Sequence, residues 1–462
     1  MAREAIRIRK VIEAVRQGIA SRAHPPGARL PSVRQQARTL EVSVSTVVEA
    51  YERLAAEGLL EPRAGSGFYV KGAVAPLALS ALAPRLDREV DPLWLSRQSL
   101  EADPEVLKPG CGWLPPTWMP EASMRRALRQ IARGPAEALC DYGSPLGLPA
   151  LRMLLARRLA GAGIAAQPEQ VLLVESGTQA VDLVCRFLLS PGDTVLVDDP
   201  CYFNFHALLR AHRVQVVGVP YTPEGPDVEA FAEVLRTHAP RLYITNSGLH
   251  NPTGATLSPR VAHQVLKLAE QADMLIVEDD IFADFETMPA SRLAAFDGLS
   301  RVIHVGSFSK TLSASARCGY IAARADWIDD LADLRIATSF GGGRLASEVL
   351  LAVLTDGGYR RHVEALRTRL AVEMRRVIDR LAPLGIMPWH VPTAGMFVWC
   401  RLPDGVQATP LAQHCLARGV VLAPGNAFSP AQRAGQFLRF NVAQCGSPRI
   451  FEVLGEALSA QR

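Results

Sequence analysis

Apolar residues recur with a helical period over residues 8–19, and a Pro-Pro-Gly sequence at residues 25–27 ends this pattern. Ser32 is the expected N-cap of a second helix that runs to about residue 40. Ser43 is the expected N-cap of a third helix, with an apolar stripe over residues 44–55. Two short helices joined by a tight turn predict a helix-turn-helix, whose second helix enters the major groove of DNA N-terminus first.

Two short apolar segments, residues 59–60 and 68–70, flank a Gly-rich basic tip that contains Arg63. They predict a β-hairpin wing beside the helices, with Arg63 placed to reach the DNA backbone or the minor groove. Ser45 and Thr46, at the start of the third helix, are small polar residues suited to phosphate or base contacts. Periodicity alone leaves a three-helix protein-interaction domain as the alternative.

Strand-like apolar runs alternate with helical stretches from residue 109 onward, at residues 171–174, 194–197, 242–245, 275–277 and 302–305. This alternation predicts a parallel sheet covered by helices. Polar residues follow the runs directly, and open α/β sheets bind ligands at the carboxyl ends of their strands. The intervening stretch, residues 72–105, loses clear periodicity and is broken by Gly and Pro, which predicts a linker.

Composition and charge agree with two domains. A chain of 462 residues is too long for one ordinary core, and 48% apolar with 21% charged residues is typical of globular proteins. No membrane-length apolar run and no signal core are present, so we expect a cytoplasmic protein. Eight scattered cysteines without a C-x-x-C pair argue against a metal site or a disulfide framework. Residues 1–70 hold 11 Lys/Arg and 7 Asp/Glu, so the chain's whole excess of +4 lies in the predicted DNA-binding region.

Lys310 is the candidate for covalent cofactor chemistry. It follows the last predicted strand and the turn Ser307-Phe308-Ser309, and precedes Arg317-Cys318-Gly319-Tyr320. Pyridoxal 5'-phosphate (PLP) needs a lysine whose amine bonds to its aldehyde and loses its proton readily. An ordinary surface lysine is the alternative, and the neighbouring residues favour the cofactor site.

Donors for a cofactor phosphate are also present. Ser176-Gly177-Thr178-Gln179 follows a strand and opens a helix, which makes an anion site, although an ordinary helix cap would have the same sequence. Ser307 and Ser309 would add hydroxyls, and Arg317 would add a forked, charge-assisted pair.

The pyridine ring makes three further demands. A carboxylate must face its nitrogen, and Asp279 fits, although sequence alone does not separate Asp279 from Glu278 and Asp280. Tyr202 can stack on the ring. Asn251 can bond the 3-oxygen, although its Asn-Pro-Thr-Gly sequence is also an ordinary turn.

The N-terminal motifs resemble the GntR family of bacterial transcription factors. They are Arg29-Leu30-Pro31-Ser32-x-Arg34, Ser45-Thr46-Val47 and Glu57-Gly58-Leu59-Leu60 with Gly65-Ser66-Gly67. The resemblance implies that the DNA contacts are Arg34, Ser45, Thr46 and Arg63 of this chain.

The rest of the chain resembles PLP-dependent fold type I aminotransferases from about Pro109 onward. Beside the residues already named, the motifs are Tyr142-Gly143-x-x-x-Gly147, Gly395-Met396-Phe397 and Leu438-Arg439-Phe440. The resemblance implies that Arg439 binds the α-carboxylate of a substrate or effector, and that Tyr142 is supplied by the partner subunit of a homodimer. As a whole the chain resembles the MocR-type regulators.

These observations define the expected architecture. Residues 1–71 form a winged helix-turn-helix, α with a β-wing, and residues 72–105 form the linker. Residues 106–462 form a large α/β fold type I aminotransferase-like domain, with a smaller C-terminal α+β subdomain from about residue 345 to 462.

One departure bears on function. In many such aminotransferases a tyrosine soon after the acidic pair reaches the PLP 3-oxygen, whereas Ile281 and Phe282 stand here. Efficient transamination is therefore doubtful, and the main hypothesis is a DNA-binding regulator that senses a small amine or amino acid through an external aldimine at Lys310. The alternatives are a working aminotransferase with an accessory DNA-binding head, and a regulator that responds to PLP itself.

Overall fold

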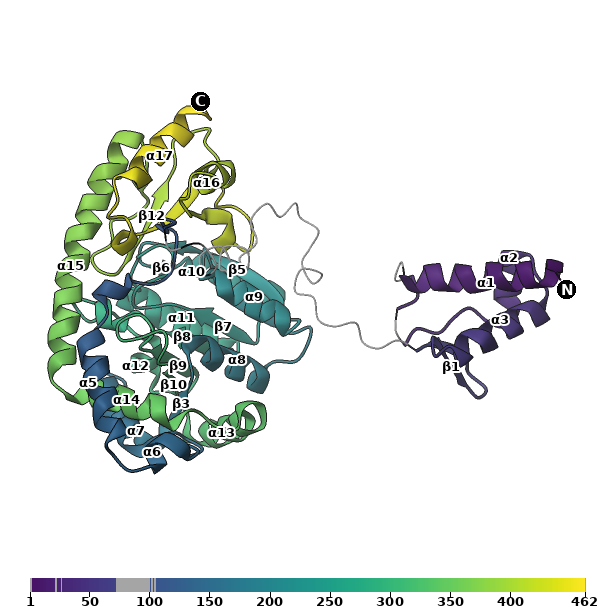
Figure 1. Ribbon diagram of the computed structural model, residues 1–462, viewed down its shortest axis with the longest axis horizontal. Helices are drawn as coiled ribbons and strands as arrows, with labels where there is room; N and C mark the ends of the chain where they lie inside the picture. Colours follow the sequence, from purple (N-terminus) through teal and green to yellow (C-terminus); the bar gives the residue numbers. More distant parts are fainter. Residues whose placement is uncertain are drawn as a thin grey trace. The chain divides into compact units, whose positions relative to one another are not determined.

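The computed structural model describes residues 2–20, 23–25, 27–71, 100, 103 and 105–461. The chain divides into two compact units, Met1–Ala78 and Leu79–Arg462, which we call the head and the body (Figure 1). Most of the predicted linker lies outside the described residues, and the predicted domain boundaries stay predictions. No helix within the described ranges is long and apolar enough to cross a membrane.

The head has the predicted three helices and wing. Their bounds are α1 (Ala2–Ala20), α2 (Val33–Leu40), α3 (Val44–Ala56), β1 (Leu60–Arg63) and β2 (Gly67–Val70). Ser32 and Ser43 are the N-caps of α2 and α3, and each side chain accepts a backbone N–H three residues on, at 3.2 Å. Tyr51 and Leu54 are fully buried in the head core, where the Tyr51 ring meets the edge of the wing's Phe68 at 5.2 Å.

The body is built on an eight-stranded sheet. In spatial order the strands are β3 (Val171–Val174), β10 (Gly319–Ala322), β9 (Val302–Ser307), β8 (Leu275–Asp279), β7 (Leu242–Thr245), β4 (Thr194–Asp199), β5 (Gln215–Thr222) and β6 (Gly225–Pro226). The five strands predicted from apolar runs are all present. Strands β9, β8, β7, β4 and β5 are parallel neighbours, so their carboxyl ends lie along one edge of the sheet.

The predicted parallel pairing is confirmed for strands β9, β8, β7 and β4, and the complete sheet is mixed. Strand β10 pairs antiparallel with both β3 and β9. Antiparallel neighbours need no crossover helix, so the short segment between β9 and β10 can stay at the carboxyl edge of the sheet. Lys310 lies in that segment. Gly319 begins β10 where a Cβ atom would lie only 2.9 Å from the backbone of Ser176.

Helices cover both faces of this sheet, as the buried runs predicted. Their bounds are α5 (Glu121–Ala132), α6 (Glu137–Cys140), α7 (Pro149–Gly161), α8 (Gly177–Leu188), α9 (Phe203–Ala211), α10 (Val228–His238), α11 (Pro259–Gln271), α12 (Leu293–Asp297), α13 (Ala325–Ser339) and α14 (Arg344–Thr355). One core lies between the sheet and α7, α10, α11, α12 and α14, and the other lies under α8, α9 and α13. Alternate residues of one strand enter opposite cores: Ile276 packs in the first and Val277 in the second.

A smaller four-stranded antiparallel sheet forms a further subdomain near the C-terminus. Its strands are β11 (Met387–Pro388), β12 (Phe397–Arg401), β14 (Phe437–Asn441) and β13 (Ala423–Pro424), and its helices include α16 (Ala408–Leu416) and α17 (Arg449–Ser459). The long helix α15 (Gly358–Leu381) joins it to the large sheet (Figure 1). Tyr359 and Val363 of α15 pack in the large core, whereas Leu366 and Leu370 pack in the small one.

Two of the three acidic residues at the end of β8 make buried structural contacts. Both carboxylate oxygens of Glu278 accept backbone N–H groups at the start of α12, at 2.6 and 2.9 Å. Asp280 accepts from the buried Arg292 at 2.7 Å, and Arg292 also bonds Glu286 at 2.8 Å. Burial would raise the pKa of Asp280, but His304 and Arg292 outweigh it and hold that pKa below its usual value.

Replacing the shared cation tests this arrangement. Arg292→Leu is expected to lower the free energy of unfolding of the body by about 3–5 kcal/mol, because two buried carboxylates lose their partner. Urea unfolding followed by tryptophan fluorescence measures it, since none of the six tryptophans lies in residues 1–71. The control, Arg236→Leu, removes an exposed ion pair and should change stability by less than about 0.5 kcal/mol. Equal losses in both variants would contradict the structural role of Arg292.

Candidate cofactor and effector site

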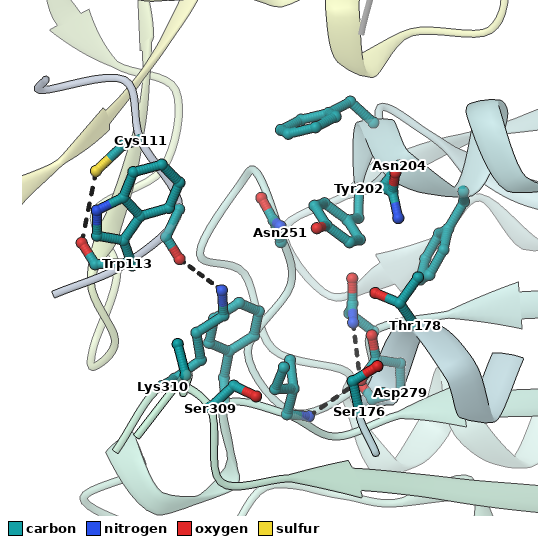
Figure 2. A pocket seen from close by; sticks show the side chains of 18 of the residues that line it. Cys111, Trp113, Ser176, Thr178, Tyr202, Asn204, Asn251, Asp279, Ser309 and Lys310 are labelled. Atoms are coloured by element: carbon teal, nitrogen blue, oxygen red, sulfur yellow. Dashed lines mark hydrogen bonds between the residues drawn. The ribbon is translucent and has the colours of Figure 1, made fainter. Parts of the chain in front are cut away.

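A cavity of about 570 Å³ lies in the body beside the carboxyl ends of β7, β8 and β9. Its wall brings together most of the predicted body site residues: Gly177, Thr178, Tyr202, Asn251, Asp279, Ser309, Lys310, Arg317 and Arg439. Figure 2 shows Lys310, Tyr202, Asn251 and Asp279 directed toward one common space. A volume of this size is ordinary for a cofactor site.

Lys310 carries its amine into the buried part of the cavity. Its Nζ donates to the carbonyl of Gly112 at 2.6 Å. Burial and, to a smaller extent, the positive charge of Arg439 lower the pKa of Lys310 to about 8, against weaker opposite effects of Cys111 and Asp279. A far larger fraction of this amine is therefore neutral at pH 7 than for an exposed lysine, which suits a nucleophile.

Asp279 is the only one of the three neighbouring acids in the cavity wall. Its Oδ1 accepts the backbone N–H of Ile281 at 3.2 Å. Burial raises the pKa of Asp279 to about 6, so the carboxylate would gain from a cationic N–H partner. Of the three acids only Asp279 faces the cavity, because Glu278 and Asp280 bond the start of α12 and Arg292.

The start of α8 lines one end of the cavity. Ser176, its N-cap, accepts the N–H of Gln179 at 3.1 Å, and the wall here also contains Gly177 and Thr178. Ser309 and Arg317 reach the same cavity from the β9–β10 segment. Backbone N–H groups, hydroxyls and a guanidinium in one place are the donor set of a phosphate site.

Three predicted site residues lie outside the cavity wall. Gln179 turns its side chain back, and its Oε1 accepts the N–H of Glu175 at 2.6 Å. The Ser307 hydroxyl lies 2.9 Å from Ser309 Oγ, behind the wall. Tyr142 is 78% exposed and packs against Phe340 with ring centroids 5.0 Å apart.

Arg439 is a buried cation without a carboxylate neighbour among the described residues. Its Nη1 donates to Asn251 Oδ1 at 2.9 Å and its Nη2 to the carbonyl of Gly110 at 2.7 Å, while its buried Nε has no partner. The guanidinium also lies 4.1 Å from the centre of the Phe397 ring and 4.7 Å from that of Phe428. Burial lowers the pKa of Arg439 to about 10. An incoming carboxylate would supply the missing countercharge.

Two further parts of the wall were not predicted from the sequence. Asn246 directly follows β7, and its Nδ2 donates to the carbonyl of Asp279 at 2.9 Å; its position at a strand end was the available signal. Residues 110–113 cross the cavity, held by Lys310, Arg439 and Asn441. Gly110 is required there, because a Cβ atom would lie 2.5 Å from the backbone of Ala423. Nothing in the local sequence indicated that contact.

The residues present fit PLP. A buried amine of low pKa, an anion-binding helix start, a buried carboxylate and an aromatic ring surround one cavity, and Asn251 stands beside them. Phe282 also lines the cavity and packs against Phe397 at 5.5 Å, so an apolar ring occupies the position where a tyrosine would donate. No cluster of His, Cys, Asp or Glu suited to a metal occurs in the described parts of the chain.

Of the four candidate DNA contacts in the head, three are exposed and one is buried. Arg34 and Ser45 are exposed on α2 and at the start of α3. Arg63 is exposed beside the wing tip, 4.3 Å from the centre of the Tyr69 ring. Thr46 is buried, with its hydroxyl 2.7 Å from Ser43 Oγ, so its side chain supports the start of α3 and Ser45 is the exposed hydroxyl.

Comparisons with known proteins agree with both units. Residues 117–455 match the family "Aminotransferase class I and II", and residues 7–70 match "Bacterial regulatory proteins, gntR family". The uncharacterized HTH-type transcriptional regulator YdfD of Bacillus subtilis is 28% identical over 94% of this chain and 92% of its own length. HTH-type transcriptional regulator NorG of Staphylococcus aureus is 25% identical over 88% and 94%.

Solved structures match the body. The α-aminoadipate aminotransferase LysN of Thermus thermophilus, complexed with N-(5'-phosphopyridoxyl)-L-leucine, is 25% identical with a TM-score of 0.73, over 83% of this chain and 99% of that one. The kynurenine aminotransferase of Pyrococcus horikoshii shares the fold with a TM-score of 0.74 at 24% identity, over 83% and 97%. The predicted fold class is confirmed. The chain belongs to the PLP-dependent aminotransferase class I and II family and, with its gntR-family region, has the MocR-type architecture of a winged helix-turn-helix joined to a fold type I body.

Proposed function

We propose that this protein is a DNA-binding transcriptional regulator that holds PLP at Lys310 and senses a small amine or amino acid there. The observation that carries the proposal is the buried Lys310 amine facing Asp279 and Arg439 in a chain that also has a gntR-family head. The curated relatives of matching length and architecture are named as transcriptional regulators. DNA binding would place the protein in the cytoplasm.

Different residues of the cavity would bind different parts of the cofactor and of the effector. When bound, PLP supplies an electrophilic aldehyde carbon that bonds to a primary amine. Asp279 would accept a hydrogen bond from the protonated pyridine nitrogen, Tyr202 would cover the ring, and the start of α8 with Ser309 and Arg317 would bind the phosphate. Arg439 would bind a carboxylate on the effector, since its Nε lacks a partner.

Residues 110–113 offer a route by which the signal leaves the cavity. The carbonyls of Gly110 and Gly112 are held by Arg439 and Lys310, at 2.7 and 2.6 Å. A carboxylate at Arg439, or a changed partner for the Lys310 amine, would compete with these bonds. The segment lies on the covalent path from the head to the body, so its altered position would shift the population of DNA-binding states.

Phe282 favours sensing over turnover. A phenyl ring cannot donate a hydrogen bond, so only Asn251 of this pair could donate to the PLP 3-oxygen, through its Nδ2, while its Oδ1 accepts from Arg439. A working aminotransferase and a regulator of PLP alone remain the alternatives that the experiments below separate.

We also propose a homodimer. Tyr142, Phe340 and Leu139 are exposed apolar residues of the body, and Tyr142 would reach the partner's cavity. Paired heads would match two DNA half-sites. In the head, Arg34, Ser45 and Arg63 would make the DNA contacts, with Thr46 supporting α3.

Attachment of PLP should follow the pKa of Lys310. The rate of covalent labelling, trapped with borohydride and located by peptide mass spectrometry, should rise as pH increases through about 8, because only the neutral amine attacks. Arg439→Gln removes a positive charge that lowers this pKa, so its midpoint should lie at higher pH. Lys267→Ala, on the exposed side of α11, should label as the wild type does. A midpoint near 10.5 in the wild type would contradict the buried amine.

The regulatory role is tested with genomic DNA fragments selected by the full-length protein. With PLP present, one amine from an amino-acid panel should change the DNA affinity of the wild type about 5–150-fold, the usual range of allosteric coupling. Lys310→Ala should bind the same fragments without this response. A response to PLP alone would favour the cofactor as the signal. Keto acid release at roughly 10 per second would favour the aminotransferase.

A further inference from the structure

Positive charge is concentrated on one group of body helices. Helices α5, α7, α14 and α15, which we call the basic flank, contain fourteen arginines and five acidic residues, a net charge of +9. The whole chain has a net charge of +4. Residues 1–70 also have a net charge of +4, so the remainder of the chain is neutral in total. The rest of the chain beyond residue 70 must therefore carry about −9, so the balanced total hides a strong separation of charge.

These four helices are neighbours in space. Helix α14 packs against α5, α7 and α15 and they lie on the same side of the body in Figure 1. An ion pair of 2.9 Å joins Arg126 of α5 to Asp356, just before α15. Arg158 of α7 lies 5.7 Å from the centre of the Tyr359 ring at the start of α15. The four helices therefore form one connected region of the body.

Part of this charge is neutralised locally and part is not. Arg125, Arg126 and Arg376 pair with acidic residues at 2.7–2.9 Å. Within the described residues, no carboxylate lies in ion-pair distance of four other exposed arginines of the flank: Arg129, Arg157, Arg361 and Arg375. A helix rise of 1.5 Å per residue puts Arg361 and Arg375 about 21 Å apart on α15, and their phases place both on its exposed side.

We propose that the basic flank is a second DNA-binding surface, which contacts phosphates of the DNA beyond the site bound by the heads. The proposal rests on the DNA-binding function proposed above. Over about 21 Å a DNA strand presents roughly six phosphates, so a row of exposed guanidinium groups can contact several of them. Such contacts carry no sequence information and would set the path of the flanking DNA along the body.

The test compares two full-length variants of equal charge. The flank variant has four substitutions: Arg129→Gln, Arg157→Gln, Arg361→Gln and Arg375→Gln. The control removes four exposed arginines elsewhere on the body: Arg236→Gln, Arg260→Gln, Arg401→Gln and Arg418→Gln. Unchanged unfolding by tryptophan fluorescence establishes that both are folded. Binding to mixed-sequence duplexes of about 20 and about 60 base pairs is measured against salt concentration, since about 20 base pairs hold two half-sites.

The salt dependence decides the outcome. The wild type should show a steeper slope of log K against log salt on the long duplex than on the short one. The flank variant should lose about one unit of slope per phosphate contact on the long duplex only, and the control should keep the wild-type slope. Equal slopes on both lengths, or equal losses in both variants, would overturn the proposal.

Two further outcomes are distinct from these. If the wild type binds neither duplex, the DNA-binding function itself fails, and the basic flank fails with it. A contact between two copies of the chain is the other outcome, because the four aspartates of α13 could attract the basic flank of a second copy. If light scattering shows that the flank variant loses self-association while its DNA binding is unchanged, the flank is a contact between copies and the proposal is wrong.

Discussion

Two cations without a full countercharge are buried beside one another in the body, and this constraint organises the site. Lys310 and Arg439 both border Gly112, and Asp279 is the carboxylate that acts on Lys310 from the wall. Removing a charge from water costs several kcal/mol unless partners replace the water. Here the partners are backbone carbonyls, an amide and aromatic rings, which are weaker than carboxylates. An anionic ligand in the cavity would bring the missing charge.

Sheet topology brings the required groups to this place. Strands β7, β8 and β9 end side by side, and they deliver Asn246, Asp279 and the segment that contains Lys310. The return of the chain into the antiparallel β10 keeps Arg317 at the same edge. Residues far apart in sequence meet because each follows a strand, and the small sheet closes the cavity with Arg439 on β14.

Local signals account for what could be predicted. Strand ends and helix caps pointed to the acidic residues 278–280, Ser176 and Lys310, because each stands next to a recognisable element. The geometry of the three acids could not be predicted, since it depends on Arg292 and on the start of α12, both distant in sequence. The course of residues 110–113 depends on contacts with Arg439 and Ala423, which no local pattern indicates. Ser45 is exposed and Thr46 is buried. Because both are small polar residues and adjacent in the sequence, this difference could not be predicted.

Helix α15 belongs to two hydrophobic cores at once, with Tyr359 and Val363 in the large one and Leu366 and Leu370 in the small one. A helix is cooperative along its length, so neither core can melt without weakening the hydrogen bonds that support the other. The two subdomains should therefore form one folding unit in spite of their separate sheets. A molecule bound in the cavity between them would consequently strengthen the entire body against unfolding, and protection from proteolysis would extend to the end of α17.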